Sequence, residues 1–188
     1  MDSQRIQVKL YSTVAHDPEK LIPVFHRFIR DKVFDELMID VADYGHVKDG
    51  PGVALIGHAS DYFADLSEGR FGLVYTRKRE APPPSERLLD AVRRALNGAR
   101  LVEKEPGLEG LRFATNELLF RFTDRLRAPN DAATFSALEA ELAPITAKLY
   151  GASGVSVEKV GEPRDVLSAR VRAANAPATV EELYNRLG

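Results

Sequence analysis

A glycine-rich stretch between Asp40 and Tyr75 constrains the fold of this chain more than any other segment. It contains six of the thirteen glycines, two of the four histidines and three of the six tyrosines. Apolar runs at residues 37–41 and 53–56 flank a polar loop, residues 43–52, in which glycine, proline and aspartate supply turn geometry. We therefore expect two short strands here, and we place the candidate functional site of the chain in this stretch.

Outside this stretch, two periodicities predict the remaining elements. Apolar residues alternate with polar ones where a half-buried strand is expected, and they recur every three to four residues where an amphipathic helix is expected. Ser67-Glu68-Gly69 predicts a hairpin turn. Strands are expected at residues 6–11, 71–76, 118–123, 155–157 and 167–171. Helices are expected after Asp17, Ser85, Pro129 and Thr179.

The order of these elements repeats itself. Residues 1–104 read β-α-β-β-β-α and residues 111–188 read β-α-β-β-α, with the linker-like residues 105–110 between them. We expect an α+β fold made of two similar βαββ-type halves, with mixed or antiparallel sheets and helices packed on one face. The pattern leaves open whether the two halves stand side by side or share one sheet in a compact domain.

Composition places the chain among ordinary globular proteins. Apolar residues make up 44% and charged residues 29%, the formal net charge is −2, and cysteine is absent. These values give no electrostatic case for a nucleic-acid or membrane partner, and they exclude disulfides and thiolate chemistry. The N-terminus has no apolar core typical of a signal peptide, and no run of about 18 apolar residues occurs. With a high content of alanine and arginine, we expect a soluble, cytoplasmic, bacterial protein.

The common motifs of catalysis and cofactor binding are absent from the sequence. There is no P-loop, no H-E-x-x-H and no EF-hand pattern, and the glycines from Gly50 to Gly57 have the wrong spacing for a dinucleotide fingerprint. Ser60 lacks the flanking glycines of a nucleophile elbow. We predict no metal site and identify no cofactor.

Polar residues gather in the Asp40–Tyr75 stretch. If residues 59–62 form a helical turn, His58 and Asp61 share one face, where the imidazole could transfer a proton and the carboxylate could orient it. The structural alternative is that His58 bonds a neighbouring backbone group and Asp61 caps a turn. If residues 37–41 and 53–56 pair as a hairpin, His46 and His58 lie at opposite ends of it. We assign candidate ligand-binding roles to His46, Asp43, Tyr44 and Tyr62.

A second polar feature is basic. Residues 77–79 read Arg-Lys-Arg, and Arg87, Arg93 and Arg94 follow on one predicted helix. One interpretation is contact with phosphates of a nucleic acid. The alternative, favoured by the balanced net charge, is a solvated helix face on which neighbouring acids offset the arginines.

Three functional hypotheses follow. The first is a non-enzymatic binding or self-assembly module that forms a homo-oligomer, because the edge strands of small sheets are commonly paired or covered. The second is a small-molecule-binding protein or an enzyme that uses the Asp43–Tyr75 region, with His58 and Asp61 as its catalytic pair. The third is a nucleic-acid-associated module that uses the arginines. We rank the hypotheses in this order because the sequence contains no catalytic signature.

Overall fold

The computed structural model describes residues 2–47 and 50–188. Along the chain, its elements are β1 (Ile6–Ser12), the 3-10 helix η1 (Pro18–Leu21), α1 (Ile22–Arg30), β2 (Met38–Asp43), β3 (Val53–Gly57), β4 (Ser60–Asp65), the 3-10 turn η2 (Ser67–Gly69), β5 (Gly72–Arg77), α2 (Arg87–Glu103), β6 (Phe113–Phe122), α3 (Ala132–Tyr150), β7 (Val155–Val160), β8 (Leu167–Ala173) and α4 (Val180–Asn185). Asp49, part of the predicted polar loop, lies outside the described residues.

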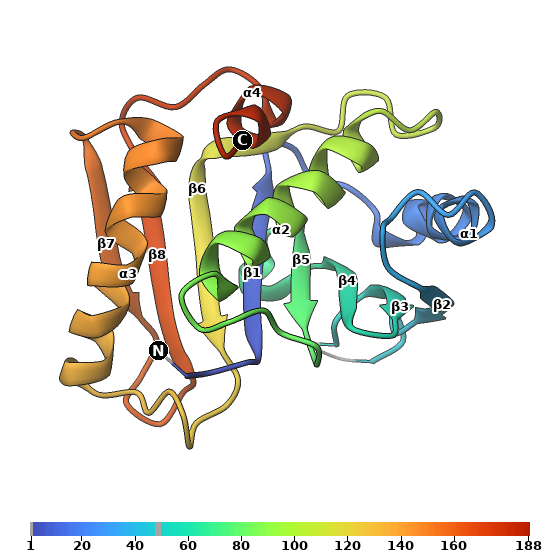
Figure 1. Ribbon diagram of the computed structural model, residues 1–188. Coiled ribbons are helices and arrows are strands. Elements are labelled where there is room, and N and C mark those ends of the chain that lie inside the picture. Colours follow the sequence, from blue (N-terminus) through green and yellow to red (C-terminus); the bar gives the residue numbers. More distant parts are fainter. Residues whose placement is uncertain (1, 48–49) are drawn as a thin grey trace.

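The strands within the described residues form one antiparallel sheet of eight, in the order β2-β3-β4-β5-β1-β6-β8-β7 (Figure 1). The pairing of β1 with β6, in which Val8 lies opposite Phe120, joins the two halves of the chain. The question left open by the sequence is thus answered by one continuous sheet.

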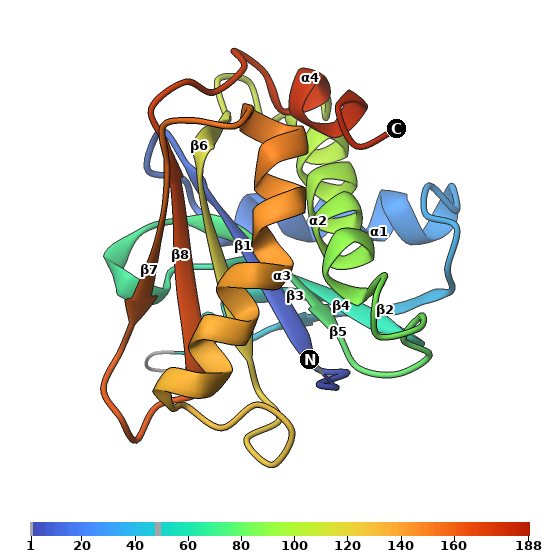
Figure 2. The same cartoon turned by 60° about the vertical axis from the view of Figure 1, so that its left-hand side comes forward.

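Both halves follow the same path through this sheet. The first strand of each half lies at the centre, a helix leads to the outer edge, and the following strands return to the centre. Because neighbours are antiparallel, β1 and β2 run in the same direction with three strands between them, and β6 and β7 do so around β8. Each half is therefore a split β-α-β unit. The helices lie on one side of the sheet (Figures 1 and 2), which confirms the predicted α+β fold class.

The core lies between the sheet and the helices. On β1, Ile6, Val8 and Leu10 are buried against the helix layer, because alternate side chains of a strand share one face. Helix α2 buries the stripe predicted from its helical spacing, which includes Leu88, Val92, Ala95, Leu96 and Ala99.

The face of the sheet opposite the helices, here called the second face, is covered in part by the β4–β5 connection, residues 66–71. Figure 2 shows this connection on the side away from α2 and α3. Lys9, Tyr11 and Leu119 point to the second face, yet each exposes 1% or less of its surface. The second face is therefore packed, rather than open, around these three side chains.

Strand β4 was not predicted. Its sequence, SDYFAD, has no clear alternation and contains two aspartates, which are rare in strands. Since residues 60–62 belong to β4, they do not form the helical turn on which the His58–Asp61 pairing depended. Leu108, in the linker-like segment, is 1% exposed and packs into the core. Among the described residues, no helix is long and apolar enough to cross a membrane.

Candidate functional site

A buried lysine anchors the β4–β5 connection to the second face. Lys9 Nζ lies 2.5 Å from Asp65 Oδ2, and it donates hydrogen bonds to Ser67 and to the carbonyl of Arg70. Burial lowers the pKa of Lys9, although the carboxylate of Asp65 beside it favours the charged form. Both charged groups are buried where the dielectric constant is low, so each needs the other as its counter-charge.

Glu68, at the tip of the connection, is the second anchor. Its backbone adopts a left-handed conformation, with φ +64°, which is uncommon for a residue with a side chain. Its carboxylate accepts hydrogen bonds from Tyr11 (2.7 Å), Arg121 (3.1 Å) and Arg170 (2.9 Å). Burial alone would raise the pKa of Glu68, but these donors outweigh it and lower the pKa. Burial and the Glu68 carboxylate raise the pKa of Tyr11 to about 12.

Arg70 completes the anchoring. Its guanidinium lies 3.8 Å from the centre of the Tyr11 ring and makes paired hydrogen bonds of 3.1 and 3.0 Å to the carboxylate of Glu117. Stacking on an aromatic ring and forked bonding to a carboxylate are both favourable for arginine. The connection is thus held rigidly across β1, β6 and β8.

The anchored connection forms one wall of a hollow of about 640 Å³. Its other walls are η1, Asp43 at the end of β2, and the β2–β3 loop that begins with Tyr44. We call this cavity the Asp43–Gly69 hollow. Gly52 has φ +71°, and a β-carbon there would lie 2.0 Å from the carbonyl oxygen of Ala64. Gly52 is therefore required for close packing of the loop on β4. Glu68 lines this hollow and a neighbouring one of about 460 Å³ over β6 and β8.

The predicted site residues fall into separate places. Asp43 and Tyr44 line the Asp43–Gly69 hollow, with Asp43 Oδ1 accepting the Gly45 amide at 2.7 Å. His46 is exposed in the adjoining turn. Tyr62 is instead in the core, where its ring stacks on that of Phe34 with centroids 4.8 Å apart.

His58 lies in the turn just beyond the far end of β3, and Asp61 lies on β4 opposite Ile56 of β3. Because β2 and β3 pair as an antiparallel hairpin, His46 and His58 are at its opposite ends. His58 is exposed, and its Nε2 lies 3.1 Å from Glu80 Oε1. Asp61 instead pairs with Lys78 at 2.7 Å and accepts the Gly57 amide at 3.1 Å. The two side chains thus have different partners, and Asp61 ties the β3–β4 turn to the end of β5.

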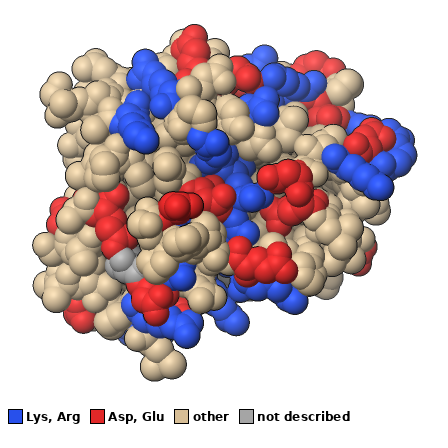
Figure 3. All heavy atoms as spheres, in the orientation of Figure 1, with Lys and Arg blue, Asp and Glu red and all other residues tan. Residues whose placement is uncertain are grey.

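The predicted basic feature separates into buried and exposed members. Arg77 is 5% exposed and pairs with Asp90, which also binds Arg94 Nε at 3.0 Å. Arg94 reaches Asp35 at 2.9 Å. On the helix-bearing face, basic side chains gather at the centre and acidic ones flank them (Figure 3). Arg77 and Arg94 are therefore part of a structural ion-pair cluster rather than a solvated patch.

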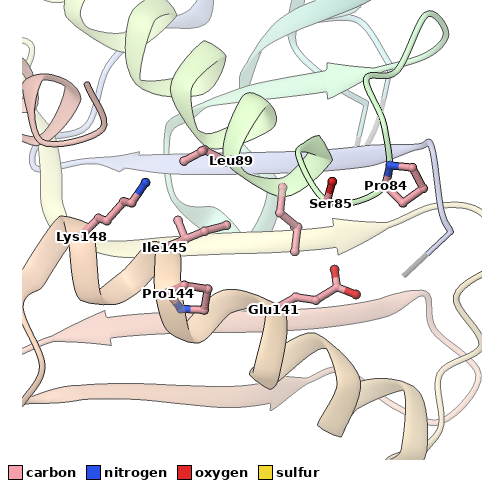
Figure 4. Close-up of a pocket in the computed structure, with 8 residues that line it drawn as sticks. Pro84, Ser85, Leu89, Glu141, Pro144, Ile145 and Lys148 are labelled. Atoms are coloured by element: carbon pink, nitrogen blue, oxygen red, sulfur yellow. The ribbon is translucent and has the colours of Figure 1, made fainter.

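A groove of about 550 Å³ lies between α2 and α3 (Figure 4). Leu88 and Ile145, which are 5% and 7% exposed, form its floor, while Leu89 and Pro144 form its sides. Pro84 and Ser85 close one end, and Lys148 stands at the other.

Exposed apolar side chains concentrate at one edge of the sheet. Of eight large apolar side chains that are exposed among the described residues, five lie between residues 33 and 47, along β2 and the loops on either side of it. We call them the β2-edge patch: Val33, Leu37, Ile39, Tyr44 and Val47.

Within residues 2–47 and 50–188, no group of three or more histidine and carboxylate side chains is placed to hold a metal ion. Comparisons of the chain with protein-family models, with curated proteins and with solved structures give no match. Function must therefore be inferred from geometry and chemistry.

The network around Lys9 and Glu68 was not predicted from the sequence. The one available signal was Lys9 itself, a charged residue between Val8 and Leu10 in an alternating strand. In such a strand the sequence places Lys9 opposite the core, where solvent is expected. Its burial depends on Asp65, 56 residues further along the chain, and on the connection that follows Asp65.

Proposed function

We propose that this chain is a non-enzymatic binding module that associates with a second copy of itself through the β2-edge patch. The observation that carries this proposal is the exposure of Leu37 (67%), just before the edge strand β2, and of Ile39 (55%) on it. Exposed apolar clusters on a sheet edge are typical of protein contacts. A contact about a two-fold axis places the same patch on both copies, so apolar side chains meet apolar side chains.

The opposite edge of the sheet supports this choice by contrast. Strand β7 exposes Glu158 and Lys159, and it carries none of the large exposed apolar side chains found in the described part of the chain. Charged side chains are a common protection of edge strands against association. The sheet thus has a protected edge at β7 and an apolar edge at β2.

The backbone of β2 determines the kind of contact. The pairing register of β2 with β3 shifts between Met38 and Asp40, a bulge that turns Ile39 outward. The Asp40 carboxylate accepts the amide of Val41 at 2.8 Å, so this edge donor is already used. We therefore propose packing of side chains across the contact rather than continuation of the sheet by strand pairing.

Sedimentation of the purified protein over a range of concentrations tests the proposal. We expect a reversible dimer, and we expect Ile39→Lys to weaken it at least about tenfold, because each dimer buries two copies of this side chain. Leu126→Lys is the matched control, since Leu126 is 96% exposed in the β6–α3 connection. The proposal fails if the unaltered protein stays monomeric at millimolar concentration, or if the two variants behave alike.

The Asp43–Gly69 hollow favours a second candidate function, the binding of a small molecule. Its volume lies within the range of about 300–1,000 Å³ that is usual for small-molecule sites. Native mass spectrometry of untagged protein reports both the oligomer and any bound mass. An extra mass lost in Asp43→Ala and kept in His58→Ala would support this hollow. The reverse result would favour an active site at His58 and Asp61.

A further inference from the structure

We propose that the groove between α2 and α3 binds a medium-chain fatty acid, with its carboxylate at Lys148 and its chain along the apolar floor. The groove is separate from the β2 edge and from the Asp43–Gly69 hollow, so this inference is independent of the proposed function.

The walls of the groove specify an aliphatic chain. Leu88, Leu89, Pro144 and Ile145 line its length, and its described lining contains no aromatic side chain. Aliphatic walls offer dispersion contacts and removal of water, but they offer no stacking partner for a planar ring. Its volume of about 550 Å³ suits a small molecule rather than a protein segment.

The charges near one end of the groove specify an anionic head. Lys148 stands at this end (Figure 4), and its side chain makes no hydrogen bond or ion pair with any other described residue. Arg93 follows Leu89 by one turn on the same side of α2, and its guanidinium donates hydrogen bonds to the carbonyl oxygens of Leu187 and Gly188. Arg186 bonds the carbonyl oxygen of Leu149, next to Lys148. Of these three cations only Lys148 lines the groove, so Lys148 is the group that favours a carboxylate at this end.

The opposite charge on the rim does not cancel this preference. Glu141, which has interactions of its own, precedes Lys148 by seven residues on α3. Two helical turns correspond to about 10 Å along the axis. This separation exceeds the Debye length of about 8 Å at physiological salt, so salt weakens the repulsion between the Glu141 carboxylate and the head group.

Titration calorimetry with decanoate, below its micelle concentration, tests the proposal. We expect saturable binding by the whole protein, with decanol weaker by several-fold and decylamine weaker still. Shortening the acid to octanoate and hexanoate should weaken binding several-fold at each step, because each methylene buried contributes to affinity. Equal affinity for the acid and the amine, or affinity independent of chain length, would overturn the proposal.

Variants locate the site. We expect Lys148→Glu to weaken decanoate binding at least about tenfold by reversing the charge at the head group. Lys20→Glu is the matched control, because it makes the same charge change on η1, away from the groove. Leu89→Ala, which removes a half-buried wall, should weaken binding several-fold while the fold remains intact by circular dichroism. If Lys20→Glu and Lys148→Glu weaken binding equally, the effect is one of net charge and the groove is not the site.

Discussion

Gly98 of α2 lies against the ring of Tyr62 on β4, so closely that a β-carbon at position 98 would stand 2.4 Å from Tyr62 Cε1. The ring is held in place, because it packs on Phe34 and on Tyr75, with ring centroids 4.8 and 5.3 Å away. The absence of a side chain at Gly98 is therefore what allows α2 to approach the sheet.

Gly98→Ala should destabilise the protein. Inside a helix, replacing glycine by alanine normally stabilises by about 0.5–1 kcal/mol, but overpacking against Tyr62 should cost about 1–3 kcal/mol. Urea unfolding measures the difference. In a Tyr62→Leu background the same substitution should cost less, since the ring is gone. A more stable Gly98→Ala variant would contradict the packing described here.

Lys9→Met should cost about 3–5 kcal/mol of unfolding free energy, because it leaves the carboxylate of Asp65 buried without its cation. The double variant Lys9→Met/Asp65→Leu should recover part of this loss, as both charges are then absent. Urea unfolding gives the free energies, and hydrogen exchange at residues 66–71 should show faster opening in the single variant. Equal stability of the single variant and the unaltered protein would mean that Lys9 is solvated.

Tyr11 should make the stability of the protein depend on pH at the alkaline end. An unfolded tyrosine loses its proton near pH 10, whereas the pKa of folded Tyr11 is about 12. Between these values the unfolded state binds fewer protons than the folded state, so stability falls as the pH rises. Tyr11→Phe should make this fall shallower. Urea unfolding at several pH values gives the slope, and an unchanged slope would show that Tyr11 is not responsible.

Asp90→Asn should destabilise by about 2–3 kcal/mol, because it leaves the guanidinium of Arg77 buried without its counter-charge. Asp35→Asn is the matched control. Asp35 also pairs with an arginine of this cluster, Arg94, but its side chain is 76% exposed, so its loss should cost about 0–1 kcal/mol. Thermal or urea unfolding compares the two, and similar losses would argue against a buried cluster.

A comparison of the predicted and observed elements shows which of them can be located from apolar periodicity. The helix after Ser85 and the strand near residue 6 were correctly located, because their apolar spacing reflects burial on one face. Strand β4 was missed for the opposite reason. Aspartate has a low strand propensity, so the local sequence disfavours a strand here. The two aspartates are tolerated because Lys78 neutralises Asp61 and Lys9 neutralises Asp65. Both partners come from other strands or their ends, which no local pattern reveals.

The candidate site residues divide in the same way. Asp43 and Tyr44 line a hollow in the loop that glycine content had singled out, whereas Tyr62 lies in the core. The aromatic ring of Tyr62 is compatible with either place, and the choice depends on Gly98, which is 36 positions away in the sequence. Polarity and turn propensity identified the loop, but they did not identify which side chains line the hollow beside it.

Local patterns were sufficient for the α+β class, for the helices and strands other than β4, and for the absence of the common nucleotide and metal motifs. These properties depend on spacing along a few turns of helix or a few residues of strand. Three features could be seen only in the tertiary structure. The two halves join through the pairing of β1 with β6, Lys9 and Arg77 are buried, and β2 exposes apolar side chains at a sheet edge. Each of these results from contacts between residues distant in sequence, whose energies depend on burial and charge pairing that exist only once the sheet has formed.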